Sequence, residues 1–380
     1  MRLGDCCKTN LHTYSDKEKW SLIRYLDTGS ITEGRIDEIQ TLYPGVDKIP
    51  SRARRKASVG DILFSTVRPN QKHYGIIEAG TENLLVSTGF TVVTVDTTIA
   101  DPYFIYYYLT QSSVIESLQA IAEQSTSTYP SIKPSDIEDI ELDLPELETQ
   151  KKIGSTLRML DRKIALNEEI NDNLHQQAAT LFKALFVDLT PFDGTMPPNW
   201  TISTLGDATE MGAGGDKPKE SSPVKTPLCP YPIYSNGIND YGLYGYTNDP
   251  KIKVESVTVS ARGTIGYVCL RHTPYVPIVR LVTLIPDTKV LSAKYLYLYL
   301  RQLHITGTGT TQQQLTVPDF RKTEIIIPDK NTMDSFTETV TPLFEQIWAN
   351  EDENTKLAEV RDALLPKLMS GEIDVSDIQL

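Results

Sequence analysis

Apolar residues recur at alternating steps of four and three along residues 153–185, which is the heptad pattern of a helix packed along one face. The positions of this seam are Ile153, Leu157, Leu160, Ile164, Asn167, Asn171, Leu174, Ala178, Leu181 and Leu185. The pattern predicts a long helix within residues 146–190 that buries one stripe against a partner. Two asparagines fall on the seam near its middle, where apolar side chains are expected.

The same pattern returns 183 residues later in the chain. This second seam comprises Phe336, Val340, Leu343, Ile347, Asn350, Asn354, Leu357, Arg361, Leu364 and Leu368. Both copies read I-x-x-N-E-x-x-N-x-x-L, so the asparagines recur at equivalent positions. The repeat predicts a second long helix within residues 329–380 and indicates that the whole chain is duplicated.

Shorter matches precede each long helix. The tripeptide L-G-D occurs at 3–5 and at 205–207, and DPYFIYYYLTQ (101–111) parallels SAKYLYLYLRQ (292–302). Asp101 and Ser292 suit helix N-caps, so both stretches are predicted to be short helices. Their tyrosines are interpreted as core residues, with a base-stacking surface as the alternative.

Each half also contains a β-rich stretch and a polar stretch. GDILFSTVRPN (60–70) and ESVTVSARGTIGYV (255–268) predict strands that lead into a turn with one arginine. QSTSTYPS (124–131) and TGTGTTQQQ (306–314) are predicted loops. We therefore expect an α+β fold with a pseudo-two-fold internal repeat. Its segments are a mixed α/β domain (1–145), a long helix (146–190), a second mixed α/β domain (191–328) and a second long helix (329–380).

Chain connectivity predicts that the two long helices pack antiparallel. The first helix joins the second domain through the helix's carboxyl-terminal end. The second helix leaves the same domain through the helix's amino-terminal end. Antiparallel pairing would place Asn167 opposite Asn354 and Asn171 opposite Asn350, so that amides fix the register. The apolar seam spans ~48 Å at ~1.5 Å per residue, equal to ~14 DNA base pairs. The alternative is that the asparagines face solvent.

The net charge of −13 argues against a nucleic-acid partner when the chain is taken whole. The acid is concentrated, however, because residues 329–380 hold 12 acidic against 4 basic residues, while residues 191–328 hold 11 against 13. The stretch 48–72 carries seven basic residues and one acid. A local cationic patch is therefore expected.

The sequence gives little indication of catalysis or of a metal site. Four cysteines and five histidines are scattered without zinc spacing, and the cysteines are expected to be small buried or partly buried thiols. GAGGDKPK (212–219) departs from the phosphate-loop pattern and is read as a loop. MPPNW (196–200) lacks the aromatic residue directly after the prolines that a base-flipping methyltransferase needs. The chain has no signal-like or membrane-spanning run, so a cytoplasmic location is expected.

Several segments resemble the specificity subunits of type I restriction-modification systems. The most specific are LPELETQKKIGSTLRMLDRKIALNEEINDNLHQQAATLFKALFVD (144–188) and MPPNWTISTLGD (196–207). The resemblance implies two target recognition domains, each reading one half of a split DNA sequence, separated by a coiled-coil spacer that docks two methyltransferase subunits. It also implies restriction (translocase/nuclease) subunits as partners. Cofactors would then lie on the partners: S-adenosylmethionine on the methyltransferase, and ATP and Mg on the restriction subunit, with none in this chain.

Candidate DNA-binding residues follow from the chemistry of base and phosphate recognition. Base edges are expected to meet Arg68, Asn70, Gln71, Gln124 and Ser127 in the first domain, and Asn236, Asn239, Arg262, Gln312 and Gln313 in the second. Phosphates are expected to meet Arg52, Arg54, Arg55, Lys56, Lys217, Lys219 and Lys251. No catalytic residue is predicted.

The sequence leaves two other functions open. One is a coiled-coil adaptor with two protein-binding domains, which the polar composition of the loops disfavours because protein interfaces are enriched in aromatic anchors. The other is a stand-alone modification enzyme, which would need cofactor motifs. The resemblance to type I specificity subunits also implies that the assembled complex is an adenine-specific DNA methyltransferase and, with the restriction subunit, an ATP-dependent endonuclease.

Overall fold

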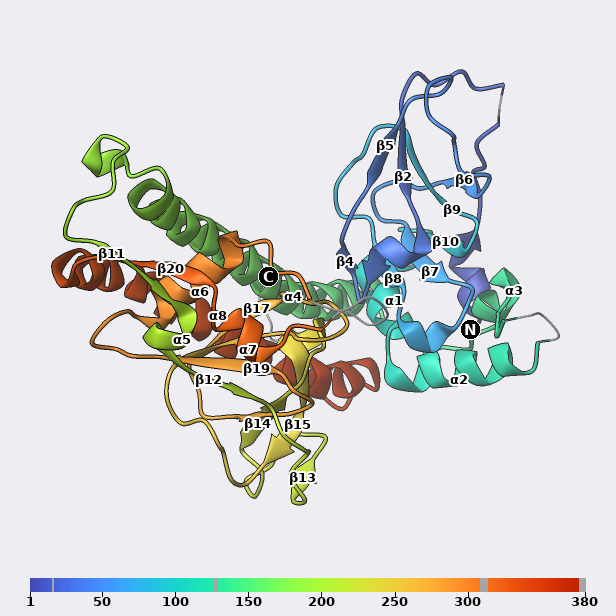
Figure 1. Cartoon of the computed structure of the whole chain (residues 1–380). Coiled ribbons are helices and arrows are strands. Elements are labelled where there is room, and N and C mark those ends of the chain that lie inside the picture. Colours follow the sequence, from blue (N-terminus) through green and yellow to red (C-terminus); the bar gives the residue numbers. More distant parts are fainter. Residues whose placement is uncertain (16, 126–128, 308–313, 376–380) are drawn as a thin grey trace. The chain divides into compact units, whose positions relative to one another are not determined.

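The computed structural model describes residues 1–15, 17–125, 129–307 and 314–375. The chain packs as two compact units: unit 1 comprises Met1–Leu166 and Asp352–Leu380, and unit 2 comprises Asn167–Glu351. Two long helices, α4 (Leu147–Phe182) and α8 (Lys330–Met369), therefore each contribute one part to unit 1 and the other part to unit 2. Both helices are labelled in Figure 1. This confirms the predicted mixed α/β fold with long helices.

Unit 1 contains two four-stranded sheets. The first has the order β1-β10-β7-β8 and is antiparallel throughout. The second has the order β5-β2-β9-β6, in which β2 and β9 run parallel. The strands are β1 (Cys7–Thr9), β2 (Ile23–Leu26), β5 (Gln40–Leu42), β6 (Ala53–Lys56), β7 (Ile62–Ser65), β8 (Tyr74–Ile76), β9 (Leu84–Ser87) and β10 (Phe90–Val95), with a small hairpin of β3 (Ile31–Thr32) and β4 (Arg35–Ile36). The helices of this region are α1 (Pro102–Leu109), α2 (Ser112–Glu123) and α3 (Pro134–Glu138).

Unit 2 repeats this arrangement. Its antiparallel sheet has the order β12-β19-β16-β17, and a second sheet has the order β13-β15-β14-β18. The strands are β12 (Thr209–Ala213), β13 (Ser221–Ser222), β14 (Tyr231–Tyr234), β15 (Leu243–Thr247), β16 (Ser256–Val259), β17 (Val268–Arg271), β18 (Val276–Pro277) and β19 (Val282–Pro286), with β11 (Thr201–Thr204) paired to β20 (Glu324–Ile327). Its short helices are α5 (Leu205–Ala208), α6 (Ala293–Gln302) and α7 (Val317–Phe320).

The two L-G-D tripeptides occupy matching places in the two units. Leu3 and Leu205 are both fully buried. The Leu3 amide donates to Ile140 O at 2.8 Å, and the Leu205 amide donates to Thr323 O at 2.9 Å. Each tripeptide thus ties the start of a globular region to the segment just before its long helix, which explains why the motif recurs.

The two predicted short helices are confirmed as α1 and α6, with their predicted caps. The Asp101 carboxylate accepts from the Phe104 amide, and the Ser292 hydroxyl accepts from the Tyr295 amide. Such caps satisfy donors that would otherwise be orphaned in the first turn. Tyr106 and Tyr295 are buried, so these tyrosines belong to the cores.

The long helices run antiparallel within each unit. In unit 1, Lys163 pairs with Glu353 at 3.1 Å and Asp161 with Arg361 at 2.7 Å, so positions fall along α4 as they rise along α8. In unit 2, the ring centroids of Phe182 and Phe336 are 6.1 Å apart. The Asn171–Asn350 hydrogen bond lies in the same unit, so α4 and α8 are antiparallel there as well.

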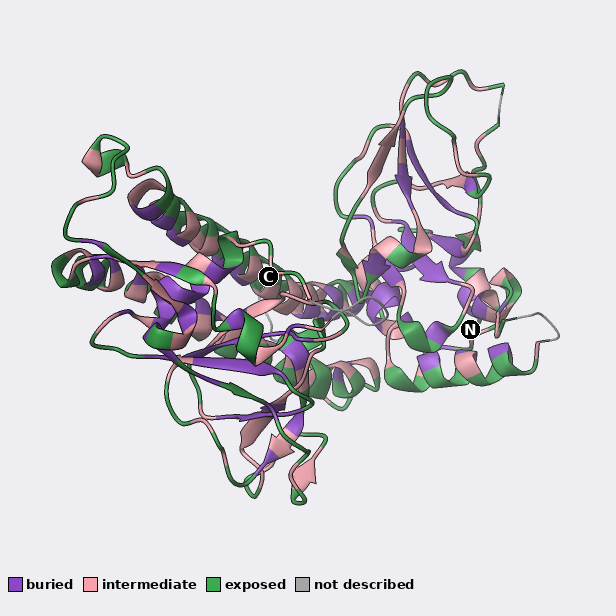
Figure 2. Cartoon of the chain, viewed as in Figure 1, coloured by how far each residue is buried: buried purple, intermediate pink, exposed green. Residues whose placement is uncertain are grey.

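The predicted seams form the inner faces of the helices, because none of their residues is exposed. Gly154 shows how closely unit 1 packs: a Cβ on this residue would lie 2.6 Å from the Asp101 carboxylate. After Phe182 the chain continues through a π-helical turn, Lys183–Val187. Figure 2 shows buried residues on the central strands and on one side of the helices. Across the described residues, no helix combines the length and apolar character that a membrane span requires.

Candidate nucleic-acid interface

An arginine-bearing turn and a polar loop meet at one edge of unit 1. After β7 the chain reaches Arg68, which has φ +49° and begins a short 3-10 helix, η3 (Pro69–Gln71). The Arg68 amide donates to Pro130 O at 3.0 Å, and its guanidinium lies 5.3 Å from the centroid of the Tyr129 ring. A β-bridge between Val67 and Ser131 holds the polar loop beside this turn.

The other predicted base-reading residues of unit 1 lie around the same turn. Asn70 and Gln71 are exposed on η3, and the backbone N–H of Asn70 donates to the Gln119 side chain on α2 at 3.3 Å. Gln124 is exposed at the C-cap of α2. Ser127 lies outside the described residues. The structure therefore brings Arg68, Asn70 and Gln71 together on a surface that a base edge can approach.

Unit 2 has an equivalent turn after the equivalent strand. Arg262 follows β16, and its Nη2 donates to the Gln314 Oε1 at 3.3 Å. Its Nε is buried and has no hydrogen-bond partner among the described residues. Gln312 and Gln313 lie outside the described residues, while Gln314 belongs to the same predicted loop. In both units an arginine follows the strand that stands third in the order of the antiparallel sheet, β7 or β16. In both units this arginine lies against a polar loop that comes after a helix.

Asn236 plays a structural part in this geometry. Its Oδ1 accepts from the Ala261 amide at 2.7 Å, and its Nδ2 donates to Val279 O at 2.7 Å. Because both ends of the amide are bonded to backbone, the side chain positions the Arg262 turn. Asn239 begins the 3-10 helix η6 (Asn239–Gly242) and is exposed.

The four basic residues predicted to contact phosphate in unit 1 do not form one exposed patch. Arg52 is exposed, whereas Arg54, Arg55 and Lys56 are half-buried in β6. Lys56 pairs with Glu18 and lies 5.2 Å from the centroid of the Trp20 ring. Burial lowers the pKa of the Arg55 guanidinium, whose Nη1 has no hydrogen-bond partner among the described residues.

The three predicted phosphate-binding lysines of unit 2 are all exposed. They are Lys217, Lys219 and Lys251. The Lys217 Nζ lies 5.2 Å from the centroid of the Tyr244 ring, and the Lys251 Nζ lies 3.5 Å from where a Cβ of Gly215 would be. Lys217 and Lys219 therefore belong to the glycine-rich loop GAGGDKPK (212–219), and Lys251 lies beside it.

The seam asparagines are largely withdrawn from solvent. Asn167, Asn171 and Asn350 are buried, and Asn354 is half-buried. In unit 2 the Asn350 Nδ2 donates to the Asn171 Oδ1 at 2.7 Å, and the Asn171 Nδ2 donates to Ile347 O at 3.4 Å. The Asn354 Nδ2 donates to Ile164 O in unit 1 at 3.5 Å. The structure thus joins Asn171 with Asn350, while Asn167 and Asn354 fall in different units.

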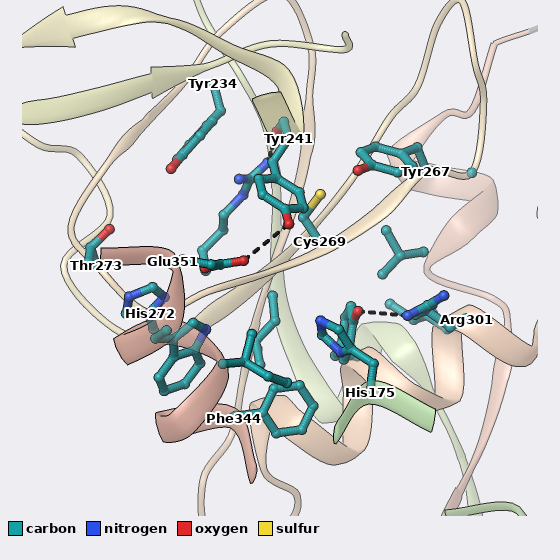
Figure 3. Close-up of a pocket in the computed structure, with 18 of the residues that line it drawn as sticks. His175, Tyr234, Tyr241, Tyr267, Cys269, His272, Thr273, Arg301, Phe344 and Glu351 are labelled. Carbon is teal, nitrogen blue, oxygen red and sulfur yellow. Dashed lines mark hydrogen bonds between the residues drawn. The ribbon is translucent and has the colours of Figure 1, made fainter. Parts of the chain in front are cut away.

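Unit 2 also holds a cavity of about 440 Å³ near the long helices (Figure 3). Two pairs of polar groups around it are hydrogen-bonded: Tyr241 donates to Glu351 at 3.1 Å, and Arg301 donates to Tyr297 at 3.0 Å. Burial raises the pKa of Cys269, which keeps its sulfur a neutral thiol and a poor nucleophile. Among the described residues, no three His, Cys, Asp or Glu side chains are grouped as a metal site.

Comparison with known proteins gives consistent matches along most of the chain. The family model for the type I restriction modification DNA specificity domain matches residues 48–176 and 197–359. The specificity subunit of the type I restriction enzyme HindI of Haemophilus influenzae is 26% identical, with 98% of each chain covered. The MjaIX specificity subunit of Methanocaldococcus jannaschii is 26% identical over 84% of this chain and 79% of that protein.

A solved structure supports the fold. The crystal structure of the type I restriction-modification system S subunit from M. genitalium superposes with a TM-score of 0.60 at 16% identity, covering 99% of this chain and 96% of that one. At this identity the likeness concerns the fold alone. Because the family model covers both halves of the duplicated chain, the protein belongs to the type I restriction modification DNA specificity family.

Proposed function

We propose that this chain is the DNA-reading subunit of a type I restriction-modification complex, and that each globular region reads one half of a bipartite target. The observation that carries the proposal is the repeated edge: Arg68 with Tyr129 in unit 1, and Arg262 with Gln314 in unit 2. Arginine is the commonest reader of guanine, and amide side chains suit adenine. Two copies of one reading edge suit a target with two halves.

In this proposal the long helices set the spacing between the half-sites and dock two methyltransferase subunits. The asparagine pair Asn171 and Asn350 fixes the register of α4 against α8. A slip of one heptad would move one helix ~10 Å past the other. It would also leave buried amides without partners, at a cost of about 1 to 3 kcal/mol each.

The chain itself supplies recognition, and its partners supply chemistry. The methyltransferase subunits bind S-adenosylmethionine and modify adenine, and the restriction subunits use ATP and Mg to translocate and cut. The purified chain should therefore bind double-stranded DNA without methylating it, and adding the methyltransferase subunits should confer methylation. Methyl transfer by the purified chain alone would contradict the proposal.

A domain exchange tests the reading of half-sites. Residues 1–145 are replaced by the same region of a relative with a different target, and methylated sites are mapped across a genome in cells that carry the complex. One half-site should change while the other is kept. The matched exchange of residues 191–328 should change the opposite half. If either exchange alters both halves, the two regions do not read separately.

A further inference from the structure

A two-residue turn in unit 2 has a backbone conformation that L residues rarely adopt. Val279 and Arg280 have φ values of +53° and +61°. The left-handed region is uncommon for any residue but glycine and is a clear outlier for β-branched valine. Such strain persists only where the surrounding structure imposes it, and it gathers at functional sites.

The surrounding structure holds this turn from three sides. The Val279 amide donates to Gly215 O at 2.9 Å, and the Arg280 amide donates to Gly214 O at 2.8 Å. The Asn236 side chain donates to Val279 O at 2.7 Å. Gly214 must be glycine here, because a Cβ would lie 2.7 Å from the Ile278 nitrogen. The glycine-rich loop GAGGDKPK therefore holds the backbone of the strained turn.

The side chains of the turn point to solvent. Val279 is 49% exposed and Arg280 is exposed. Within the described part of the chain, the Arg280 guanidinium makes no hydrogen bond and no ion pair. Lys251 lies beside Gly215 of the same glycine-rich loop. An arginine on a fixed backbone, with open donors and a lysine beside the same loop, suits an anionic or acceptor-rich partner such as DNA.

The turn is joined directly to the reading edge of unit 2. One amide, that of Asn236, bonds both to Val279 O and to the nitrogen of Ala261, the residue before Arg262. In unit 1 the link between β9 and β10, which corresponds to this turn, contains no described residue with positive φ. The strained turn is therefore a feature of unit 2 alone, as a determinant specific to one half-site would be.

We infer that Arg280 is a specificity-determining residue of unit 2, which reads an acceptor pair on a base edge such as O6 and N7 of guanine. The inference rests on the proposed function. The strained turn fixes the Cα and Cβ positions of Arg280 before DNA arrives, so the backbone needs no ordering on binding, and the planar guanidinium can meet two acceptors at once.

The test measures binding of the full chain, in complex with its methyltransferase subunits, to duplexes randomised across both half-sites. Arg280→Ala and Arg280→Lys should each lose discrimination at one base pair of one half-site, by roughly 5- to 150-fold. Arg280→Lys should keep the salt dependence, because it keeps the charge but loses the fork. Lys289→Ala, an exposed charge on the same unit, is the matched control and should keep discrimination at every position.

Val279→Gly tests the strain independently, because glycine accepts positive φ. It should raise the Tm. Uniform weakening by Arg280→Ala across sequences, with a salt slope smaller by ~1, would make Arg280 a phosphate contact and overturn the inference. Unchanged discrimination would overturn it too. If the unaltered complex itself failed to distinguish sequences, the proposed function would fail instead.

Discussion

Two threonines of β10 differ in how their hydroxyls are satisfied. Thr91 is fully buried, and its Oγ1 has no hydrogen-bond partner among the described residues. Thr94, on the same strand, donates to the buried Asp61 carboxylate at 2.6 Å. An unpaired buried hydroxyl costs free energy, whereas a paired one supports its partner.

We therefore expect Thr91→Val to raise the free energy of unfolding by up to about 1 kcal/mol, because it removes a desolvated hydroxyl. The matched change Thr94→Val should lower it by about 1 to 3 kcal/mol, because Asp61 loses a donor. Chemical denaturation of both variants measures the two effects. A loss of stability in Thr91→Val equal to that in Thr94→Val would show that the Thr91 hydroxyl has a partner in solution.

We expect His175 to make the stability of unit 2 sensitive to acid. Burial, helped by the nearby Arg301 charge, lowers the pKa of this imidazole, which lines the cavity in Figure 3. Its Nδ1 is buried and unpaired among the described residues. The unfolded chain takes up a proton near pH ~6.5, and the folded chain does so only at lower pH. The contribution of neutral His175 to the free energy of unfolding is thus fully present above the pKa of the unfolded state. It is lost as the pH falls from there toward the lower pKa of the folded state.

His175→Gln should weaken this loss. Between about pH 7.5 and 5.5, the free energy of unfolding of the unaltered chain should fall more steeply than that of the variant, by at most about 1.4 kcal/mol per pH unit. Denaturation midpoints across this range give the slopes, and His12→Gln, at an exposed histidine, controls for the loss of an imidazole. Parallel slopes for His175→Gln and the unaltered chain would contradict the expectation.

At the scale of elements, the sequence predicts the features that depend on residues close to one another in the chain. The heptad seams, the N-caps Asp101 and Ser292, and the recurrence of the arginine turns were all visible in the pattern of residues. The Val279–Arg280 turn was not, because its conformation is imposed by Gly214, Gly215 and Asn236, which are distant in sequence. The same tertiary contact explains why Asn236, predicted to read bases, is bonded to backbone at both ends.

The basic cluster of β6 shows a second limit. A run of charges in the sequence does not tell which side chains a strand turns inward, and Arg55 and Lys56 proved half-buried, with Lys56 paired to Glu18. Arg361 likewise stands out as a charge on an apolar seam. The structure explains it, because Arg361 pairs with Asp161, which also accepts from Tyr107 at 2.5 Å.

The asparagine pair gives the prediction for the long helices. Asn171→Leu should lower the free energy of unfolding by about 1 to 3 kcal/mol, because it leaves the buried Asn350 amide without its acceptor. Asn171→Leu/Asn350→Leu should cost less than the single change, because replacing both partners by apolar groups leaves no unpaired amide in the buried pair, and the exposed Gln346 that bonds to Asn350 can turn to water. A double-mutant cycle by denaturation measures the coupling. Additive single effects would mean that the two amides act independently.

At the scale of the whole molecule, the order of segments in the chain differs from their order in space. Unit 1 is assembled from both ends of the sequence, because residues 352–375 pack with the amino-terminal region of the chain. Leu368 and Val375 are buried in the same core as Leu3 and Phe104. The carboxyl-terminal half of α8 thus completes the amino-terminal globular region.

Ending the chain at Glu351 should therefore destabilise unit 1 and spare unit 2. The truncation removes the apolar side chains of α8 that share a core with Ile153 and Leu157 of α4. It also leaves the Asp161 carboxylate without Arg361. Hydrogen exchange measured by mass spectrometry should show faster exchange in α1 and β10, with β16 and β19 unchanged. Point changes on α8 give a matched pair that keeps the chain intact. Leu368→Ala should cost about 2 to 5 kcal/mol in unit 1, and Val340→Ala should act in unit 2, where Val340 is buried. Faster exchange confined to unit 2 after truncation would show that the two ends of the chain do not share one core.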